Sequence, residues 1–459
     1  MKNHTPKKSI DTIILAAGQG IRMKSNVAKV LHQLGDKCLL QHVIDAALPL
    51  TESISVVVGH NSESVKNAIN NNDINWVFQK NQLGTGHAVK QAIPNITDSS
   101  ICLILYGDVP LIQTSTLNTL IKSAETTGFS ILTVIQKDPS GYGRIIRNSR
   151  QAIQSIIEHK DASPKELAID EINTGIMAIR GSLLKKFINQ IKPNNAQGEL
   201  YLTDIAEKAV KDNVNIASFV CENSSEVMGI NNKNNLAEAE RVYQQKLAQG
   251  FMTNGLTIKD PNRFDCRGNL IFGSDCIIDV NVIFEGDNKI GNNVVIASNC
   301  IIKNAKIGDH ADIKQNSIIE NSTIGSHTSI GPFARIRPET RIGDYAKIGN
   351  FVEVKKSSIG NNSKVSHLSY IGDSSVGKDV NIGAGVITCN YDGVNKHQTV
   401  IDDGVFVGSN SQLIAPVTIG KNATIGAGST ITQDVPSEKL TLSRNKQVTI
   451  TKWKRPQKK

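Results

Sequence analysis

Aromatic residues, long apolar runs and regularly spaced cysteines are scarce or missing in this 459-residue sequence. Phe, Trp and Tyr make up 4% of the chain, so Ile and Val must carry much of the packing. The seven cysteines are odd in number, irregularly spaced and without a Cys-x-x-Cys pair, which argues against a disulfide framework or a zinc site and favours reduced thiols in a cytoplasm. No apolar run reaches the ~20 residues that span a bilayer, and the stretch 13–17 is too short for a signal-peptide core.

The net charge of the chain narrows the classes of ligand that we expect it to bind. The chain carries 51 Lys and Arg against 42 Asp and Glu, a formal net charge of +9. Such a balance suits nucleic acid, an anionic membrane surface or phosphorylated small molecules. The basic residues are scattered, apart from Lys7-Lys8 and the run from Lys452 to Lys459, and no basic helix is interleaved with aromatic residues. We therefore expect small phosphorylated ligands rather than nucleic acid.

Two regimes divide the chain, whose length allows two to four domains. Up to about Val227, short apolar runs alternate with segments of helical spacing, which predicts a mostly parallel α/β sheet covered on both faces. A stretch rich in Ala, Glu, Gln and Lys follows and predicts an exposed helix. We expect a first domain over 1–230, a linker helix over 231–250 and a second domain over 251–459. The expected strands are 12–17, 55–60, 76–79, 101–108 and 129–135, and the expected helices include 39–48 and 115–124.

From about Asn269, branched apolar residues recur every six positions. This period is typical of a parallel β-helix, in which one branched residue per repeat points inward and stacks on its equivalent one coil away, beside a small residue that fits the corner. A β-sandwich would instead show alternation of period two and irregular turns. The repeat stops after Ile387, so the polar segment from Thr388 to Val400 should leave the helix as a loop. The expected inward residues are Ile290, Ile296, Ile302, Ile324, Ile330, Ile336, Ile342, Ile348, Val354, Ile359, Val365, Ile371, Val407, Leu413, Ile419, Ile425 and Ile431.

A glycine-rich turn and one aspartate carry the candidate chemistry of the first domain. The strand 12–17 runs into Gly18-Gln19-Gly20-Ile21-Arg22, where backbone N–H groups can approach phosphate oxygens, and Arg22 and Lys29 can add charge. Asp108 follows the strand 101–106 at its carboxyl end, the edge at which α/β sheets bind ligands. A carboxylate at that edge suits Mg²⁺, and a helix-capping or turn aspartate explains Asp108 equally well.

Short motifs then follow one another along the chain. They are LAAGQGIRM (15–23), Lys29, QLGTGHA (82–88), YGD (106–108), GYGRI (141–145), Glu158, NTG (173–175), GINN (229–232), GNFVEVKK (349–356), SHLSYIG (366–372), NIGAGVITCNYDG (381–393) and VGSN (407–410). In this order they resemble, over essentially the whole chain, the bacterial bifunctional N-acetylglucosamine-1-phosphate uridyltransferase/glucosamine-1-phosphate acetyltransferase family. The resemblance implies a Rossmann-like nucleotidyltransferase (pyrophosphorylase) domain followed by a left-handed parallel β-helix of hexapeptide repeats.

The same resemblance implies residue roles in the first domain. Arg22 and Lys29 would hold the triphosphate of UTP and act in catalysis, and Asp108 and Asn231 would be the Mg²⁺ ligands. The chain departs from the family pattern at Ile21, where Thr is usual, and at Ala28, where Pro is usual. Ile21 removes a hydroxyl and Ala28 relaxes the approach to Lys29. The residues implied to bind UTP or UDP-N-acetylglucosamine are Leu15, Ala16, Gly18, Lys29, Gln79, Gly84, Thr85, Tyr106, Gly143, Glu158, Asn173 and Asn231.

His367 is the candidate base of the second domain. Acetyl transfer to an amine needs a group that takes the amine's proton, and a neutral imidazole suits that task, although an exposed histidine on a β-helix is usually only a surface residue. The resemblance makes His367 the general base. It assigns glucosamine-1-phosphate to Arg337, Glu353, Lys355, Tyr370 and Asn381. It assigns acetyl-CoA and transition-state contacts to Ala384, Asn390, Tyr391, Ser409, Ala427 and Arg444.

The expected function is therefore two sequential reactions that make UDP-N-acetylglucosamine, with acetyl-CoA and UTP as co-substrates. The resemblance also implies a homotrimer whose acetyltransferase sites lie between subunits. The basic tail around Trp453 either closes over the cofactor or is a frayed end. One rival is a sugar-1-phosphate nucleotidyltransferase with a purely structural β-helix, and another is a non-enzymatic scaffold subunit. His367 and Tyr370 argue against the first rival, and Lys29 with Asp108 argues against the second.

Overall fold

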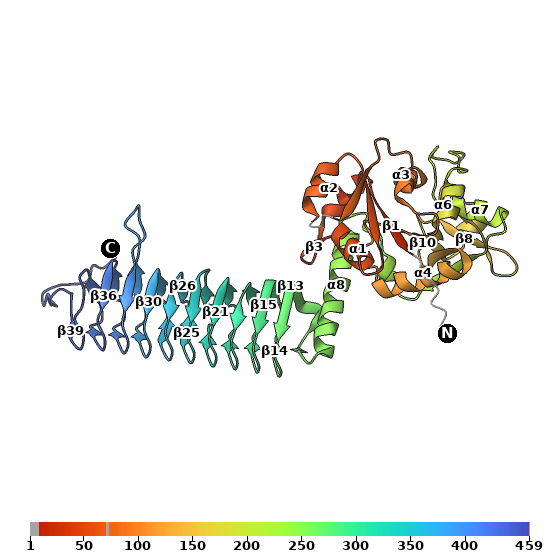
Figure 1. Cartoon of the computed structure of the whole chain (residues 1–459). Coiled ribbons are helices and arrows are strands. Elements are labelled where there is room, and N and C mark those ends of the chain that lie inside the picture. Colours follow the sequence, from red (N-terminus) through yellow and green to blue (C-terminus); the bar gives the residue numbers. More distant parts are fainter. Residues whose placement is uncertain (1–8, 70–72, 459) are drawn as a thin grey trace, which may run out of the picture. The chain divides into compact units, whose positions relative to one another are not determined.

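The computed structural model describes residues 9–69 and 73–458, which fall into two compact units, 1–243 and 244–459 (Figure 1). The limit between the units lies inside α8 (Lys233–Thr253), in the segment predicted to be an exposed helix. Although α8 is long, its sequence is polar, and none of the helices in the described parts of the chain is long and apolar enough to cross a membrane.

The first unit combines strands and helices in alternation. Its strands are β1 (Ile10–Ala16), β2 (Gln33–Leu34), β3 (Lys37–Cys38), β4 (Ser53–Val58), β5 (Ile74–Phe78), β6 (Ile101–Tyr106), β7 (Phe129–Ile135), β8 (Arg144–Arg147), β9 (Ile153–Ile157), β10 (Glu171–Arg180) and β11 (Ile216–Cys221). Its α-helices before α8 are α1 (Leu39–Ala47), α2 (Ser62–Ala68), α3 (Thr85–Ala92), α4 (Thr114–Thr127), α5 (Pro164–Leu167), α6 (Gly181–Ile188) and α7 (Asp204–Lys211). Its 3-10 turns are η1 (Ile21–Met23), η2 (Lys29–Leu31), η3 (Ile93–Asn95) and η4 (Ser224–Val227).

The main sheet of this unit, counted over its described residues, has nine strands in the order β11-β7-β10-β6-β1-β4-β5, with β8 and β9 beside β10. The strands β1, β4, β5 and β6 are parallel, whereas β10 runs antiparallel between β6 and β7. Helices α1 and α4 bury apolar side chains on one face, and α3, α6 and α7 on the other. The prediction of a mostly parallel sheet covered on both faces is confirmed, with β10 as its antiparallel member.

The position of β6 in the middle of this sheet follows from its sequence. Residues 101–105 (ICLIL) are all buried, because β1 and β10 flank the strand and helices cover both faces. A strand with no polar face fits only such a central place. The carboxyl end of β6 therefore delivers Tyr106 and Asp108 to the same edge at which β1 delivers Gly18.

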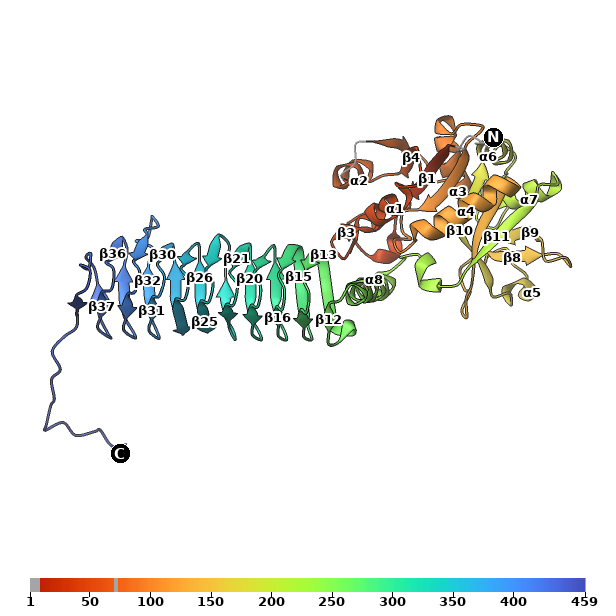
Figure 2. The same cartoon turned by 60° about the horizontal axis from the view of Figure 1, so that its bottom comes forward.

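The second unit is a parallel β-helix whose coils each contribute strands to three faces, here called A, B and C (Figures 1 and 2). Face A contains β12 (Thr257–Ile258), β14 (Ile277–Ile278), β16 (Val295–Ile296), β19 (Asp312–Ile313), β22 (Ser329–Ile330), β25 (Lys347–Asn350), β28 (Lys364–His367), β31 (Asn381–Ile382), β34 (Phe406–Val407), β37 (Thr424–Ile425) and β39 (Leu440–Thr441). Face B contains β17 (Ile301–Lys303), β20 (Ile318–Glu320), β23 (Arg335–Ile336), β26 (Glu353–Lys355), β29 (Tyr370–Gly372), β32 (Ile387–Cys389), β35 (Gln412–Ile414) and β38 (Thr430–Ile431). Face C contains β18 (Lys306–Ile307), β21 (Ser322–Ile324), β24 (Thr340–Ile342), β27 (Ser358–Ile359), β30 (Ser374–Val376), β33 (Thr399–Ile401) and β36 (Val417–Ile419), while β13 (Phe264–Phe272) and β15 (Val282–Ile290) extend along faces B and C.

The core of the β-helix consists of the branched residues that the six-residue period predicted. All seventeen expected inward residues are buried, and each stacks on its equivalent in the next coil, as Ile330 does on Ile348 and Ile348 on Val365. At roughly 1.5–3 kcal/mol for each buried Val, Leu or Ile, this column is the main source of stability of the unit. The prediction of a parallel β-helix is confirmed.

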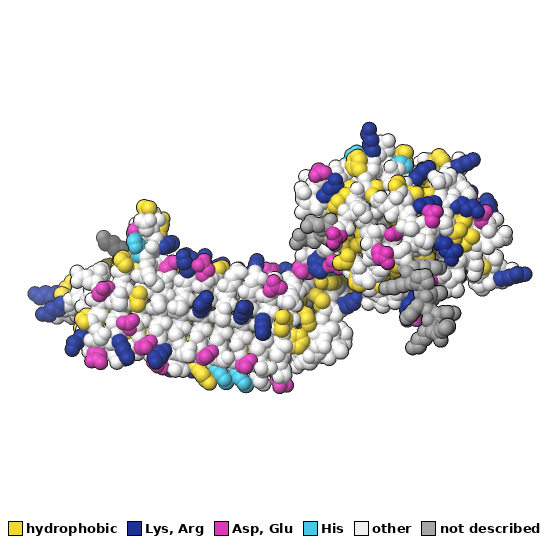
Figure 3. Space-filling model, in the orientation of Figure 1, with side chains coloured by type: hydrophobic (Ala, Val, Ile, Leu, Met, Phe, Trp, Pro, Cys, Tyr) yellow, Lys and Arg dark blue, Asp and Glu magenta, His cyan; other side chains and the backbone are white. Residues whose placement is uncertain are grey.

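The small residue beside each inward residue was expected to fit the corner, but it is required for close packing between coils. Gly343 is not in a left-handed conformation; a Cβ there would lie 2.4 Å from the Asn361 side-chain oxygen of the next coil, so glycine is needed for close approach. The left-handed corner positions are instead occupied by Asn, His and aromatic residues such as Asn316, His327 and Tyr345. The rings of His310 and His327, at equivalent corners of successive coils, stack at 4.6 Å. Figure 3 shows histidine side chains gathered on one edge of the β-helix.

The interruption of the repeat is shorter than predicted. Thr388 and Thr399 are fully buried within β32 and β33, so only residues 390–398 leave the β-helix, as the projecting loop of Figure 1. Threonine is polar, but its Oγ1 can satisfy itself inside a coil: the Gly372 N–H donates to Thr388 Oγ1 at 2.8 Å. Polarity alone therefore overestimated the loop at both ends.

Candidate functional sites

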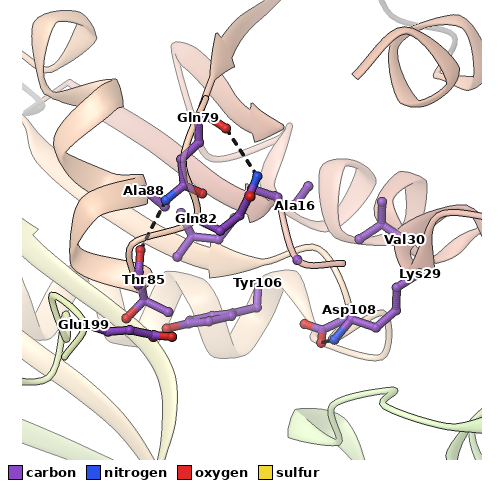
Figure 4. A pocket seen from close by; sticks show the side chains of 14 residues that line it. Ala16, Lys29, Val30, Gln79, Gln82, Thr85, Ala88, Tyr106, Asp108 and Glu199 are labelled. Atoms are coloured by element: carbon purple, nitrogen blue, oxygen red, sulfur yellow. Dashed lines mark hydrogen bonds and ion pairs between the residues drawn. The ribbon is translucent and has the colours of Figure 1, made fainter. Parts of the chain in front are cut away.

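A cavity of about 320 Å³ opens at the carboxyl ends of β1 and β6. Figure 4 shows Lys29 and Asp108 pointing toward each other on one side of it, and Gln79 and Thr85 on another. Its predicted lining residues are Leu15, Ala16, Gly18, Lys29, Gln79, Gly84, Thr85, Tyr106 and Asp108. Its unpredicted lining residues are Ala17, Val30, Gln82, Ala88 and Glu199.

Four of the predicted catalytic and metal-binding residues meet at one point. The Lys29 ammonium forms an ion pair with the Asp108 carboxylate and donates to Asn231 Oδ1 at 3.2 Å. The Arg22 guanidinium donates to the same Asn231 oxygen at 2.9 Å. Ile230 N–H donates to the Asp108 carbonyl at 2.8 Å, which ties the two segments together. Residues 209 positions apart in the chain thus share one contact.

This arrangement fits a divalent cation. The Asp108 carboxylate and the Asn231 amide oxygen both contact the Lys29 ammonium. The two oxygens therefore already face one positive charge. Within the described residues, no group of three or more His, Cys, Asp or Glu side chains is arranged to hold a metal. Mg²⁺ suits such a sparse set, because it keeps waters and takes phosphate oxygens beside one or two protein ligands.

The glycine turn before Lys29 is shaped by Gly20. Gly20 has φ +66, and a Cβ on it would lie 2.7 Å from the Lys29 Cβ. A larger residue would therefore strain the turn and displace Lys29. Of the two departures from the family pattern, Ile21 is exposed and Ala28 has φ −55, the range that proline imposes. The Ala28 backbone thus keeps a conformation that proline also adopts.

The other end of the cavity is held by a contact between distant segments. Gly84 has φ +101, and a Cβ on it would lie 2.6 Å from the Leu200 carbonyl oxygen. Gly86 N–H donates to that oxygen at 2.8 Å, and Leu202 N–H donates to Thr85 Oγ1 at 3.1 Å. Glu199, next to Leu200, lines the cavity but was not predicted to do so. No local sequence pattern indicates that residues 199–202 pack on residues 84–86.

Next to this end lie Gly143, Glu158 and Asn173, which the resemblance assigns to the N-acetylglucosamine unit and which do not line the cavity itself. Burial raises the pKa of Glu158, although Thr203 Oγ1 donates to its carboxylate at 3.0 Å. Burial also raises the pKa of Tyr106, followed by the charges of Glu158 and Asp108, so its hydroxyl remains protonated. Asn173 N–H donates to the Gly143 carbonyl at 2.8 Å. Gly143, Glu158 and Asn173 therefore lie in one neighbourhood, beside Tyr106.

In the second unit, most residues predicted for glucosamine-1-phosphate form one polar network on face B. Arg337 Nη1 lies 2.7 Å from Glu353 Oε1, and Glu353 pairs in register with Tyr370 of the next coil. The Lys355 ammonium lies 3.9 Å from an Asp373 oxygen that also accepts from Asn390. Hydrogen bonding to Glu353 is the largest cause that raises the pKa of Arg337. This group of cations and acceptors is exposed enough to meet a phosphate.

His367 lies at the corner between faces A and B and is exposed. Its Nδ1 is 2.9 Å from Asn350 Oδ1, one coil earlier. Because the amide oxygen only accepts, this contact fits the tautomer that carries its proton on Nδ1 and leaves Nε2 as the base. Three backbone bonds, from the N–H groups of Gly385, Asn410 and Gly428 to the carbonyls of His367, Ala384 and Ser409, step along this corner from coil to coil.

The predicted acetyl-CoA residues divide between this corner and the loop. Arg444 donates to the Ala427 carbonyl at 3.0 Å and so extends the column of His367, Ala384 and Ser409. Tyr391 instead lies in the loop 390–398, where the Lys396 ammonium is 4.3 Å from its ring centroid. The predicted Asn381 lies on face A. The tail around Trp453 is exposed and leaves the last coil in Figure 2, so the structure does not bring it to this column.

In the second unit, the sequence analysis missed Asn350 and Asp373. Each lies 17 residues, one coil, from a residue that was predicted: Asn350 from His367, and Asp373 from Asn390. The repeat itself was therefore the signal that could have found them.

Comparisons with known proteins find relatives and family models that match both units of the chain. Residues 12–167 match the MobA-like NTP transferase domain, residues 266–340 the GMPPB C-terminal domain, and residues 398–433 the bacterial transferase hexapeptide (six repeats). The chain is 57% identical over 452 residues to the bifunctional protein GlmU of Ruthia magnifica subsp. Calyptogena magnifica, covering 98% of this chain and 100% of the relative.

Two further relatives carry the same name. The bifunctional protein GlmU of Vesicomyosocius okutanii subsp. Calyptogena okutanii is 57% identical over 96% of this chain and 98% of its own. That of Idiomarina loihiensis is 51% identical over 97% of this chain and 98% of its own. The chain therefore belongs to the GlmU family of bifunctional enzymes, in which an N-terminal uridyltransferase and a C-terminal hexapeptide-repeat acetyltransferase make UDP-N-acetylglucosamine.

Proposed function

We propose that uridylyl transfer takes place at the Lys29–Asp108–Asn231 contact beside the cavity of the first unit. An oxygen of N-acetylglucosamine-1-phosphate attacks the α-phosphorus of UTP in line, the bond to the bridging oxygen breaks, and pyrophosphate leaves. The attacking oxygen is already anionic, so positioning and charge supply most of the rate enhancement. Lys29 and Arg22 neutralise the triphosphate, and Gln79, Gly84 and Thr85 contact the nucleotide.

The metal in this proposal is Mg²⁺, held by Asp108 and Asn231 together with phosphate oxygens. Bound there, it would neutralise the charge that develops on the phosphates. The observation that supports it is the meeting of both ligand oxygens on the Lys29 ammonium, which marks the place where the protein presents negative potential.

For acetyl transfer, we propose that His367 Nε2 accepts the proton of the glucosamine amine while the amine nitrogen attacks the thioester carbonyl. The carbon–sulfur bond then breaks and CoA leaves as the thiol. The Asn350 contact supports this role because it leaves Nε2 free of the proton. Arg337 and Lys355 would hold the sugar phosphate, and Asn381 and Tyr370 its ring. The column Ala384, Ser409, Ala427 and Arg444 would hold CoA.

We also propose the domain division 1–230, 231–250 and 251–459, a cytoplasmic location and a homotrimer that completes each acetyltransferase site. Cys102 and Cys300 are buried and form no disulfide within the part of the chain that the structure describes, which suits a reducing compartment. On the face drawn in Figure 3, basic and acidic side chains are intermixed along the β-helix.

Two assays on the wild-type chain test the function itself. Supplied with glucosamine-1-phosphate and acetyl-CoA, it should release CoA thiol. Supplied with UTP, N-acetylglucosamine-1-phosphate and Mg²⁺, it should release pyrophosphate and form UDP-N-acetylglucosamine. Pyrophosphate release without thiol release would instead identify a nucleotidyltransferase with a purely structural β-helix.

Dilution tests the trimer. Because His367 is exposed on one chain, a site completed by neighbours should lose thiol release when the enzyme is diluted below its assembly constant. The specific rate of pyrophosphate release should stay constant over the same range, because all its proposed groups lie within the first unit. Sedimentation at each concentration would report the assembly, and a constant thiol-release rate in dissociated chains would contradict the shared site.

A further inference from the structure

Lys233 and His32 form a second link between the segments that carry Lys29 and Asn231. His32 follows η2, the turn that begins at Lys29, and His32 N–H donates to the Lys29 carbonyl at 3.3 Å. Lys233 is the first residue of α8, two positions after Asn231. The Lys233 ammonium lies 3.3 Å from His32 Nδ1. Since an ammonium only donates, Nδ1 is the acceptor and the imidazole is neutral.

The surroundings of His32 keep its ring in that state. Its relative exposure is 9%, and burial, followed by the charge of Lys233, lowers its pKa. A charged imidazole would have no lone pair to offer at Nδ1 and would repel the ammonium. The contact is therefore a hydrogen bond from an exposed lysine to a buried acceptor.

In the proposed reaction, the first link between these segments is lost. Asn231 Oδ1 accepts from Lys29 and from Arg22, and in that reaction both cations turn to the triphosphate when UTP binds. The Ile230–Asp108 backbone bond remains and fixes the segment before Asn231. On the other side of Asn231, the Lys233–His32 bond uses no group that the substrates need.

We propose that Lys233 and His32 are positioning residues for uridylyl transfer, whose hydrogen bond holds Asn231 beside Asp108 after Lys29 and Arg22 have moved to the triphosphate. The inference rests on the proposed uridylyltransferase site. Through this hydrogen bond, the start of α8 affects metal affinity. Neither Lys233 nor His32 needs to contact the substrate for this role.

Binding of Mn²⁺ to the full-length chain tests this role. Free Mn²⁺ is measured by its paramagnetic resonance in the presence of UTP and without sugar phosphate, so that no turnover occurs. In Lys233→Met the dissociation constant of Mn²⁺ should rise about tenfold, the usual effect of losing a partner behind a metal ligand. Lys233→Arg, which keeps a donor, should bind within about twofold of wild type, and so should the surface control Lys66→Met.

A double-mutant cycle and one further variant separate the outcomes. His32→Leu should weaken Mn²⁺ binding as much as Lys233→Met, and the double variant should weaken it no further. Asp108→Ala reports on the site itself: if it retains Mn²⁺, the proposed metal site is wrong. If Asp108→Ala loses Mn²⁺ while Lys233→Met binds as wild type, or if the effects of Lys233→Met and His32→Leu add, the positioning role is overturned and the site stands.

Discussion

Asp108→Ala should lower kcat/KM for pyrophosphate release by about a thousandfold and leave thiol release unchanged. The substitution removes a proposed metal ligand and the partner of the Lys29 ammonium at the same time. The uncompensated Lys29 would still attract the triphosphate, so KM for UTP should change far less than kcat. The measurement is a steady-state assay of each half-reaction, supplied with its own substrates.

Asp98→Ala is the matched control for this variant. Asp98 also forms an ion pair with a lysine, Lys185, but its side chain is 72% exposed and lies outside the cavity. Its loss should change neither half-reaction by more than about twofold, because an exposed pair contributes little. Pyrophosphate release at the wild-type rate in Asp108→Ala would remove Asp108 from the reaction.

His367→Ala should show the reverse selectivity. Loss of a general base typically costs about 10²–10⁴-fold, and we expect kcat for thiol release to fall in that range while pyrophosphate release is unaffected. Thiol release is measured at saturating acetyl-CoA for the wild type and the variant.

His310→Ala serves as the control on the same β-helix. His310 is also exposed at a corner, but it stacks on His327 and lies away from the column of His367. The variant should keep full thiol release. If His367→Ala keeps the wild-type rate of thiol release, another group takes the amine's proton.

The period of six predicted the β-helix residue by residue, because each inward side chain repeats one local environment. Ile330, Ile348 and Val365 need no long-range information to be placed: the coil that precedes each one has already set its position. The ends of the loop were harder to predict from the sequence, since Thr388 and Thr399 are polar residues whose hydroxyls are buried inside coils. The Gly372 N–H donates to Thr388 Oγ1, a contact that residue polarity does not encode, whereas Thr399 Oγ1 is buried without a hydrogen-bond partner among the described residues.

The candidate sites show the same division. Lys29 and Asp108 were predicted from strand ends and charge, and the family resemblance added Asn231. Glu199 and Thr203 were missed, because their place beside Thr85 and Glu158 results from packing between segments that share no periodicity. His32 and Lys233 were missed for the same reason: 201 residues separate them, and neither stands in a motif that marks a partner.

Because the coils pack closely at Gly343 and its equivalents, the distance from one coil of the β-helix to the next is fixed. Its length can change only by whole coils, each adding about 4.8 Å, because any partial insertion would put a side chain where the next coil's backbone must lie. Evolution can therefore lengthen or shorten the early coils, 264–330, in discrete steps without disturbing the coils that hold His367. Insertions of other lengths are confined to corners, which is where the loop 390–398 arises.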